Sequence, residues 1–534
     1  MVDELCHALA VELGSANFDS ENVPSMSTLI SCCQGLITVD KEASTVRLIH
    51  FTLKEYLSAR PDIVSRPHSV MAEICLTYLN SKEVKGLSAA PSPHILDTPF
   101  LGYCSRHWGD HARKELSDYA RSLALHLLQE YDSHISGKSL LEQIGFRGYK
   151  YLGTGFRFSG LHCASFFGIV GVVAALIEME SCDIHEEDEF GGTPLVWAVR
   201  NGHEGVVEML LQRVEASPNQ PNRYGLTPLL CAALAGHEGV VKMLLHQDQV
   251  NPDKPDNYGQ TPLSHAAQNG HGIIVKMLLE RDEVNPDRPN IIGDTPLKYA
   301  AQGGYEEIVK TLLTHKDVDP DKPNRYGDTP LRNAARSGHG EIVKILLARE
   351  EVNPDKPNGS GDTPLQNAAE CGHVEIVKML LAREEVNPNK QNNNGRTPLL
   401  KAARCGHEGI VKTLLSREEV NPDKRSNHGS TPLSIAAERG HEDVVKILLA
   451  REEVNPENLD NDGDTPLACA AYGGRDRVVK ILLEQEAVNP NKADNDGLTP
   501  LMHAAQNGHQ RVIELLQPRE AVLHSTLPEL GGAS

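Results

Sequence analysis

A period of 34 residues constrains the fold of this chain more than any other feature of its sequence. The tripeptide Thr-Pro-Leu recurs ten times at this spacing, with its threonine at positions 193, 227, 261, 295, 329, 363, 397, 431, 465 and 499. Counting back 34 residues from Thr193 reaches a divergent copy that begins at Ser159, so the array has eleven units. A unit of this size cannot bury its own apolar face, but stacked copies bury each other's. The period therefore predicts an extended solenoid.

Each unit is expected to form two antiparallel helices followed by a loop. In the copy that begins at Thr329, the threonine is a good N-cap and Pro330 suits the first helical position. Gly338 stands where a helix end favours a left-handed residue, and residues 342–347 then place apolar side chains at helical spacing. The prolines and turn residues of segment 352–361 exclude a helix there, so this segment is predicted to be the loop that leads to the next unit.

The shared motif, Gly-x-Thr-Pro-Leu-x-x-Ala-Ala-x-x-Gly-His-x-x-x-Val-Lys-x-Leu-Leu, resembles the ankyrin repeat. The resemblance covers residues from about 155 to 517, and each unit has one residue more than the usual 33 of that family. It implies a binding surface for a protein partner at the loop tips and on the concave face. In the last unit Pro518 is expected to end the helix, and residues 518–534 are predicted to be a disordered tail.

A histidine ten residues after the threonine recurs in most units, at positions 203, 237, 271, 339, 373, 407, 441 and 509. Neighbouring units lie about 10 Å apart, whereas zinc needs ligand nitrogens at about 2 Å. These histidines are therefore predicted to be structural residues that start the second helix and form hydrogen bonds between units. Neither a metal nor a cofactor is predicted for the chain.

Positions that vary between the units are the candidates for contact with a partner. They lie at the loop tips and near the end of the first helix, and the candidate partner-binding residues are Phe190, Tyr224, Tyr258, Ile292 (next to Ile291), Tyr326, Arg336 and Arg404. Aromatic side chains on rigid turns are typical of interface hot spots. Two alternatives stay open: the aromatic residues cover neighbouring loops, or the arginines and the alternating acids Glu370 and Glu438 form solvated pairs between units.

Residues 1–150 lack the period and are predicted to form a separate region, with a winged-helix-like domain over residues 1–65 and a helical linker domain over residues 66–150. Within it the sequence predicts strands over 36–39 and 46–50, and helices over 5–13, 26–33, 51–57, 69–79, 103–115 and 116–131. The fold class predicted for the whole chain is all-α dominated: an ankyrin-repeat solenoid preceded by a small winged-helix and helical region.

Three segments of this region, Gln34–Val39, Val46–Leu57 and Ser105–Ala112, resemble the region directly after the NACHT nucleotide-binding module in fungal NACHT-ankyrin proteins of the STAND class, and in that class the region includes a winged helix. In that class a histidine at the strand-to-helix junction can touch the β-phosphate of the nucleotide, and His50 occupies the matching place. The chain has no G-x-x-x-x-G-K-[ST] motif to hold a phosphate, so His50 is expected to be structural.

Composition and motifs narrow the function further. The chain has 52 basic and 73 acidic residues, a net charge of -21, which disfavours nucleic-acid binding because that needs a basic face. An acidic N-terminus and the lack of a long apolar run predict a cytoplasmic protein without a membrane partner. The eleven cysteines show no C-x-x-C spacing and are predicted to be reduced packing residues.

No hydrolase, kinase, metalloprotease or dinucleotide motif occurs, so the chain is predicted not to be an enzyme. The leading hypothesis is an adaptor that binds a protein partner through the repeats. The alternative is the sensor half of a nucleotide-dependent signalling switch, with a NACHT ATPase module supplied in cis or in trans.

Overall fold

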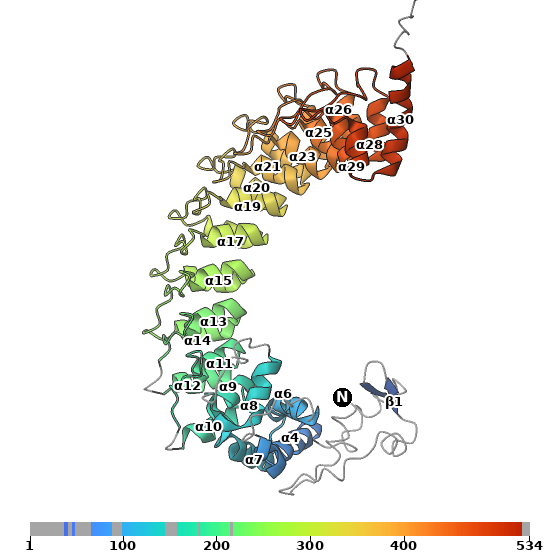
Figure 1. The fold of residues 1–534 in the computed structure, drawn as a ribbon. Helices are drawn as coiled ribbons and strands as arrows, with labels where there is room; N and C mark the ends of the chain where they lie inside the picture. Colours follow the sequence, from blue (N-terminus) through green and yellow to red (C-terminus); the bar gives the residue numbers. More distant parts are fainter. Residues whose placement is uncertain are drawn as a thin grey trace, which may run out of the picture. The chain divides into compact units, whose positions relative to one another are not determined.

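A computed structural model describes residues 37–40, 45–48, 66–87, 99–144, 157–179, 182–213 and 217–525. The chain divides into two compact units, the first comprising residues 1–262 with 280–284 and the second residues 263–279 with 285–534. Figure 1 shows that successive helices within each unit are stacked side by side, with their loops along one edge.

The first unit contains a short β-hairpin. Strands β1 (Ile37–Asp40) and β2 (Thr45–Leu48) pair antiparallel, with Ile37 opposite Leu48. This confirms the two predicted strands. The three helices predicted around the hairpin, over 5–13, 26–33 and 51–57, and the residue His50 lie outside the described residues, so the winged helix stays a prediction.

A helical bundle follows the hairpin in the sequence. It comprises α4 (Pro67–Leu79), α5 (Lys82–Leu87), α6 (Pro99–Lys114), α7 (Asp118–Leu128) and α8 (Ile135–Gln143), with a 3-10 turn over Tyr131–Ser133. Its core includes Leu76, Phe100 and Trp108, each at most 1% exposed. Helices predicted over 69–79, 103–115 and 116–131 are confirmed, although the last one ends at Leu128.

Three helix pairs follow the bundle in the first unit. They are α9 (Gly160–Phe167) with α10 (Val170–Ile177), α11 (Pro194–Arg200) with α12 (Glu204–Leu211), and α13 (Pro228–Ala235) with α14 (Glu238–Leu245). The bundle is joined to the first pair by the indole of Trp108, which meets the Phe167 ring edge-on with centroids 5.2 Å apart. The divergent copy at Ser159 is thus a complete unit.

The second unit continues the same pattern. Its helices are α15 (Pro262–Asn269, which begins at the boundary), α16 (Gly272–Leu279), α17 (Pro296–Gly303), α18 (Glu306–Leu312), α19 (Pro330–Ser337), α20 (Gly340–Leu347), α21 (Pro364–Cys371), α22 (Val374–Leu381), α23 (Pro398–Cys405), α24 (Glu408–Leu415), α25 (Pro432–Arg439), α26 (Glu442–Leu449), α27 (Pro466–Tyr472), α28 (Asp476–Leu483), α29 (Pro500–Gln506) and α30 (Gln510–Ser525). Eleven helix pairs, α9/α10 to α29/α30, confirm the predicted count and the all-α solenoid.

The helix ends form as their residue types predict. The Thr329 hydroxyl accepts a hydrogen bond from the backbone N–H of Arg332 at 3.2 Å, and Gly338 ends the first helix with φ of 85°. His339 then starts α20, and its Nε2 donates to the carbonyl of Gln302 in the preceding repeat at 3.0 Å. The recurring histidine is therefore a structural residue that links repeats.

The C-terminal end differs from expectation. Helix α30 continues through Pro518 to Ser525, so the prediction that Pro518 ends it is wrong. Residues 526–534 lie outside the described residues, and the disordered tail stays a prediction. A proline inside a helix removes one hydrogen bond and costs about 3 kcal/mol, but the hydrogen bonds of the turns on either side can still form. None of the helices in the described ranges is both long and apolar enough to cross a membrane.

Candidate partner-binding site

A carboxylate or amide five residues before almost every threonine shapes the loop tips. In the second repeat, Asp188 Oδ1 accepts hydrogen bonds from the backbone N–H groups of Phe190 at 2.8 Å and Gly192 at 2.7 Å. In the third repeat, Asn222 accepts equivalent bonds from Tyr224 at 2.9 Å and Leu226 at 3.0 Å. Sequence reasoning missed this column of residues, although it recurs in the same place in almost every copy. It holds each tip residue in a fixed position.

Backbone hydrogen bonds also join successive tips. The N–H of Arg223 donates to the Phe190 carbonyl at 2.8 Å, and the N–H of Asn257 donates to the Tyr224 carbonyl at 3.1 Å. The rings of Phe190 and Tyr224 are stacked, with centroids 6.5 Å apart and planes 13° from parallel. Two predicted site residues are thus brought together on the first unit, on a surface that is rigid before any partner binds.

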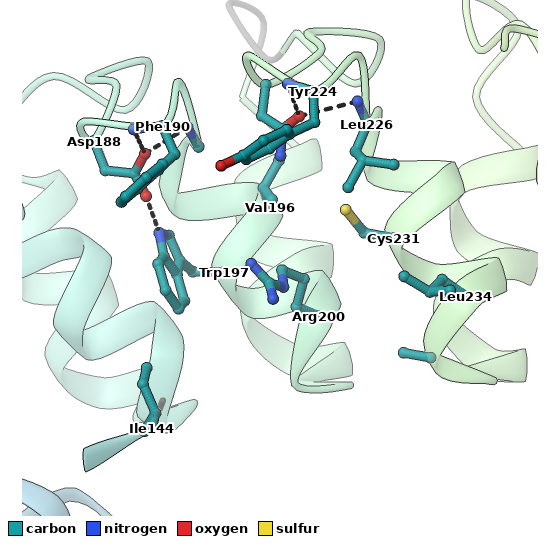
Figure 2. A pocket seen from close by; sticks show the side chains of 13 residues that line it. Ile144, Asp188, Phe190, Val196, Trp197, Arg200, Tyr224, Leu226, Cys231 and Leu234 are labelled. Carbon is teal, nitrogen blue, oxygen red and sulfur yellow. Dashed lines mark hydrogen bonds between the residues drawn. The ribbon is translucent and has the colours of Figure 1, made fainter. Parts of the chain in front are cut away.

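A cavity of about 570 Å³ lies beneath these two rings (Figure 2). Helix α11 contributes Trp197 and Arg200, helix α13 contributes Leu234, and Ile144 follows the end of α8. The remaining lining residues are Asp188, Gly192, Val196, Asn222, Leu226, Cys231 and Ala235. A concave site of this size, mostly apolar with a few fixed polar groups, is typical of binding pockets.

Trp197 forms the floor of this cavity and is held from several sides. Its indole N–H donates to Asp188 Oδ2 at 2.8 Å, so one carboxylate fixes both the floor and the rim. The Phe158 ring meets the indole edge-on at 5.3 Å, and the guanidinium of Arg200 lies 5.4 Å from the indole centroid. Arg200 stands seven residues after Thr193, at a position expected to contact a partner, but Trp197 was not identified from the sequence.

Two of the other predicted tip residues are exposed, and the third is half-buried. Tyr258, on the first unit, is 59% exposed, and Tyr326, on the second, is 62% exposed. Ile292 is half-buried, and its neighbour Ile291 is the more exposed of the pair at 49%. Ile292 is also tied to the next tip, because its carbonyl accepts a hydrogen bond from the Arg325 N–H at 2.9 Å.

The predicted arginine positions lie on the second unit. Arg336 is exposed near the end of α19, and Arg404 is half-buried near the end of α23. Glu370 occupies the same position in the repeat between them. It is paired with the buried Lys401, whose Nζ lies 2.9 Å from Glu370 Oε2. A lysine that sequence reasoning did not consider thus neutralises one of the acids expected to pair with the arginines.

Two buried thiols and one serine–histidine pair in the described part of the chain are held in unreactive states. Burial raises the pKa of Cys163 to about 12 and that of Cys231 to about 11, so both thiols stay protonated. Ser159 and His162 lie 2.7 Å apart, as a nucleophile and base would, but they form the cap of α9, and His162 Nε2 donates to the Gly192 carbonyl at 3.0 Å. Burial also lowers the pKa of His162.

The predicted packing role holds for the buried cysteines only. Cys163 and Cys231 are buried, whereas Cys371 and Cys405, at the ends of α21 and α23, are exposed. The last residue of the first helix faces solvent, and for that reason the cysteines there do not pack.

Comparison with known families gives one match. A family model for ankyrin repeats matches residues 161–256, 248–324, 316–392, 382–458 and 452–525, which is more than half of the 534 residues. A search of curated proteins finds no match.

Proposed function

This chain belongs to the ankyrin-repeat family, and from that premise we propose that it is a non-enzymatic scaffold that binds a protein partner through its loop tips and first helices. Ankyrin repeats are in general protein–protein interaction modules. The observation that carries the proposal is the cavity beneath the stacked rings of Phe190 and Tyr224.

Rigidity supports this assignment. The Asp188 and Asn222 side chains and the tip-to-tip hydrogen bonds fix the rim of the cavity in the free protein. A preordered surface loses little conformational entropy on binding, so more of the contact energy appears as affinity. Tyr224, at 50% exposure, has about half of its surface left to cover.

The lining indicates which side chain of the partner would enter. Ile144, Val196, Leu226 and Leu234 give the cavity apolar walls, and Trp197 gives it an aromatic floor. An aromatic or large aliphatic side chain of the partner fits these walls, and such anchors in central pockets dominate the energy of many interfaces. The exposed Tyr258 extends the same edge by one repeat.

Selection of binding peptides tests this proposal without knowledge of the natural partner. A library of random peptides would be selected for binding to the full chain, and the affinities of the selected peptides would be measured by fluorescence anisotropy. Tyr224→Ser with Tyr258→Ser should weaken the peptides that carry an aromatic or aliphatic anchor by tenfold or more. Tyr119→Ser is the matched control, because Tyr119 is 43% exposed but lies on α7, outside the repeats.

The peptide affinities distinguish a cavity that anchors the partner from one that does not. Loss of binding in the double variant, with unchanged binding in the control and unchanged helical content, supports the cavity as the anchor site. Equal affinity of all selected peptides for both variants would refute it. The alternative hypothesis, the sensor half of a nucleotide-dependent switch, has the β1–β2 hairpin as its support among the described residues.

A further inference from the structure

A cluster of three metal-ligand side chains lies near the C-terminal end of the array. Asp464 directly precedes the Thr465 cap of α27, Asp494 lies at the following loop tip, and His503 lies on α29. His503 Nε2 is 2.8 Å from Asp494 Oδ2 and 3.3 Å from Asp464 Oδ1, and the three ligand atoms all lie within 4.8 Å of one another. We propose that these residues bind a divalent transition-metal ion of the zinc type.

The spacing between His503 and each of the two carboxylates suits one shared ion. Zinc bonds to histidine nitrogen and carboxylate oxygen are about 2.0–2.2 Å long. Two ligands at tetrahedral or right angles around such an ion are therefore separated by roughly 2.8–3.6 Å. Both His503-to-carboxylate distances fall inside this interval. One histidine and two carboxylates leave a fourth position for water or a partner's side chain.

Hydrogen bonding leaves one carboxylate oxygen of the cluster, Asp464 Oδ1, without a donor. An N–H on one ring nitrogen points at one acceptor, and the shorter contact of His503 Nε2, at 2.8 Å, is to Asp494 Oδ2. Asp464 Oδ1 has no contact with solvent and receives no hydrogen bond. Asp494 is itself oriented from behind, because its Oδ1 accepts the N–H groups of Asp496 at 2.9 Å and Leu498 at 2.8 Å. Such outer contacts are what fix the ligands of metal sites.

The other repeats show what this place normally holds. An aspartate directly before the threonine also occurs at Asp294, Asp328 and Asp362. Each of these three is paired with a permanent cation, Lys298 at 2.8 Å, Arg332 at 2.7 Å and Lys401 at 2.8 Å.

Lys401 is the counterpart of His503, since each stands four residues after its own threonine and faces the aspartate of the preceding repeat. At Asp464 the place of the ammonium is taken by a metal-ligating imidazole, and the second carboxylate is the tip residue Asp494, where Lys401 has Glu370. A bound divalent ion would supply the missing positive charge. This site departs from the sequence-based expectation that the chain binds no metal, which considered the cysteines, known metal motifs and the histidines ten residues after each threonine but not His503.

Titration of the metal-free full chain with Zn²⁺ tests the proposal. Isothermal titration calorimetry should show that each chain binds one Zn²⁺ ion tightly. Asp464→Asn and His503→Gln should each lower the affinity for this ion at least tenfold. Asp362→Asn is the matched control, because it removes the equivalent carboxylate from the lysine-filled site and should leave this affinity unchanged. Co²⁺ should give visible absorption bands in the wild-type chain that the same two variants lose.

A further variant imitates the repeats that hold a lysine. His503→Lys would place an ammonium beside Asp464, as Lys401 does beside Asp362, and should abolish the tight Zn²⁺ binding while the chain keeps its helical circular dichroism. The proposal fails if wild type, Asp464→Asn and His503→Gln bind Zn²⁺ with the same affinity, or if His503→Lys still binds it. It also fails if the wild-type chain binds no Zn²⁺ ion more tightly than the other Zn²⁺ ions that it takes up.

Discussion

The hydrogen bond between Trp197 and Asp188 should govern the rigidity of the proposed binding rim. Asp188 is 6% exposed and accepts three bonds, one from the indole and two from the tip amides of Phe190 and Gly192. A hydrogen bond to a charged group contributes about 1.5–3 kcal/mol. Trp197→Phe removes the indole donor, so the carboxylate is left with only its backbone partners.

A double-mutant cycle with Asp188→Asn isolates that bond. Asparagine can form the same tip, as Asn222 does in the next repeat. The packing energy that is lost with the indole is the same in both Trp197→Phe variants, so it does not contribute to the coupling energy. The coupling energy should therefore be about 1.5–3 kcal/mol, which corresponds to roughly a 10- to 100-fold effect on an opening equilibrium.

Hydrogen exchange followed by mass spectrometry, on the peptide that contains Phe190 and Gly192, reads that opening directly. Asp188→Asn should accelerate exchange strongly in the tryptophan background and much less in the phenylalanine background. Tyr299→Phe provides a neutral comparison, because Asn290 Nδ2 donates to the Tyr299 hydroxyl at 2.9 Å in the equivalent place. That bond should contribute only about 0.5–1.5 kcal/mol. Equal acceleration in both backgrounds would refute the reasoning.

Three further outcomes are expected. Leu346→Ala, at a residue that is 0% exposed, should cost about 2–5 kcal/mol, while Tyr326→Ser should change stability by under about 0.5 kcal/mol; denaturant melts of the full chain would compare them. Burial lowers the pKa of His134 to about 4, below the unfolded value of about 6.5. The folded state therefore resists protonation, so amide protection in α8 should be constant above pH 6.5, fall from there towards pH 4, and fall less in His134→Gln. Asn392→Asp with Lys401→His should reproduce the proposed metal ligand set around Asp362 and add one tight Zn²⁺ equivalent to the calorimetric titration.

The repeat fold could be predicted from the sequence because its signals are local. A threonine, a proline and a glycine within ten residues set both ends of the first helix, and tertiary packing only stacks the results. The strands around residues 41–44 were predictable for the same reason. Pro518 is the counterexample, since a proline weakens a helix without always ending it, and whether the helix continues is decided by the residues around it.

The candidate sites depend on contacts that no local pattern encodes. Ile144 reaches the cavity from a helix that has no counterpart in the repeats, and Trp197 meets Asp188 across a turn of nine residues. The sequence showed that Tyr224 and Phe190 occupy equivalent tips, but only the structure shows that their rings stack over a cavity. Asp464 and His503 are likewise far apart along the chain, so the sequence does not show that their side chains lie close together.

The near-identical loops of the array suggest that its copies have had little room to specialise, yet one position that is buried in most repeats contradicts this. Four residues after the threonine, successive repeats carry Trp197, Cys231, His265, Tyr299, Asn333, Asn367, Lys401, Ile435, Cys469 and His503. In four repeats this side chain contacts a loop tip or a neighbouring carboxylate. Trp197 and Tyr299 bond the tip residue of their own repeat, Lys401 bonds the aspartate of the preceding repeat, and His503 contacts both kinds of residue. A substitution at this position changes which polar or apolar contact the side chain can make between two repeats. It leaves both helices in place, because the helix caps and the apolar face are formed by other residues. Both proposed sites, the aromatic cavity and the metal cluster, include a residue from this position, which indicates that the array diversifies from its interior as well as from its tips.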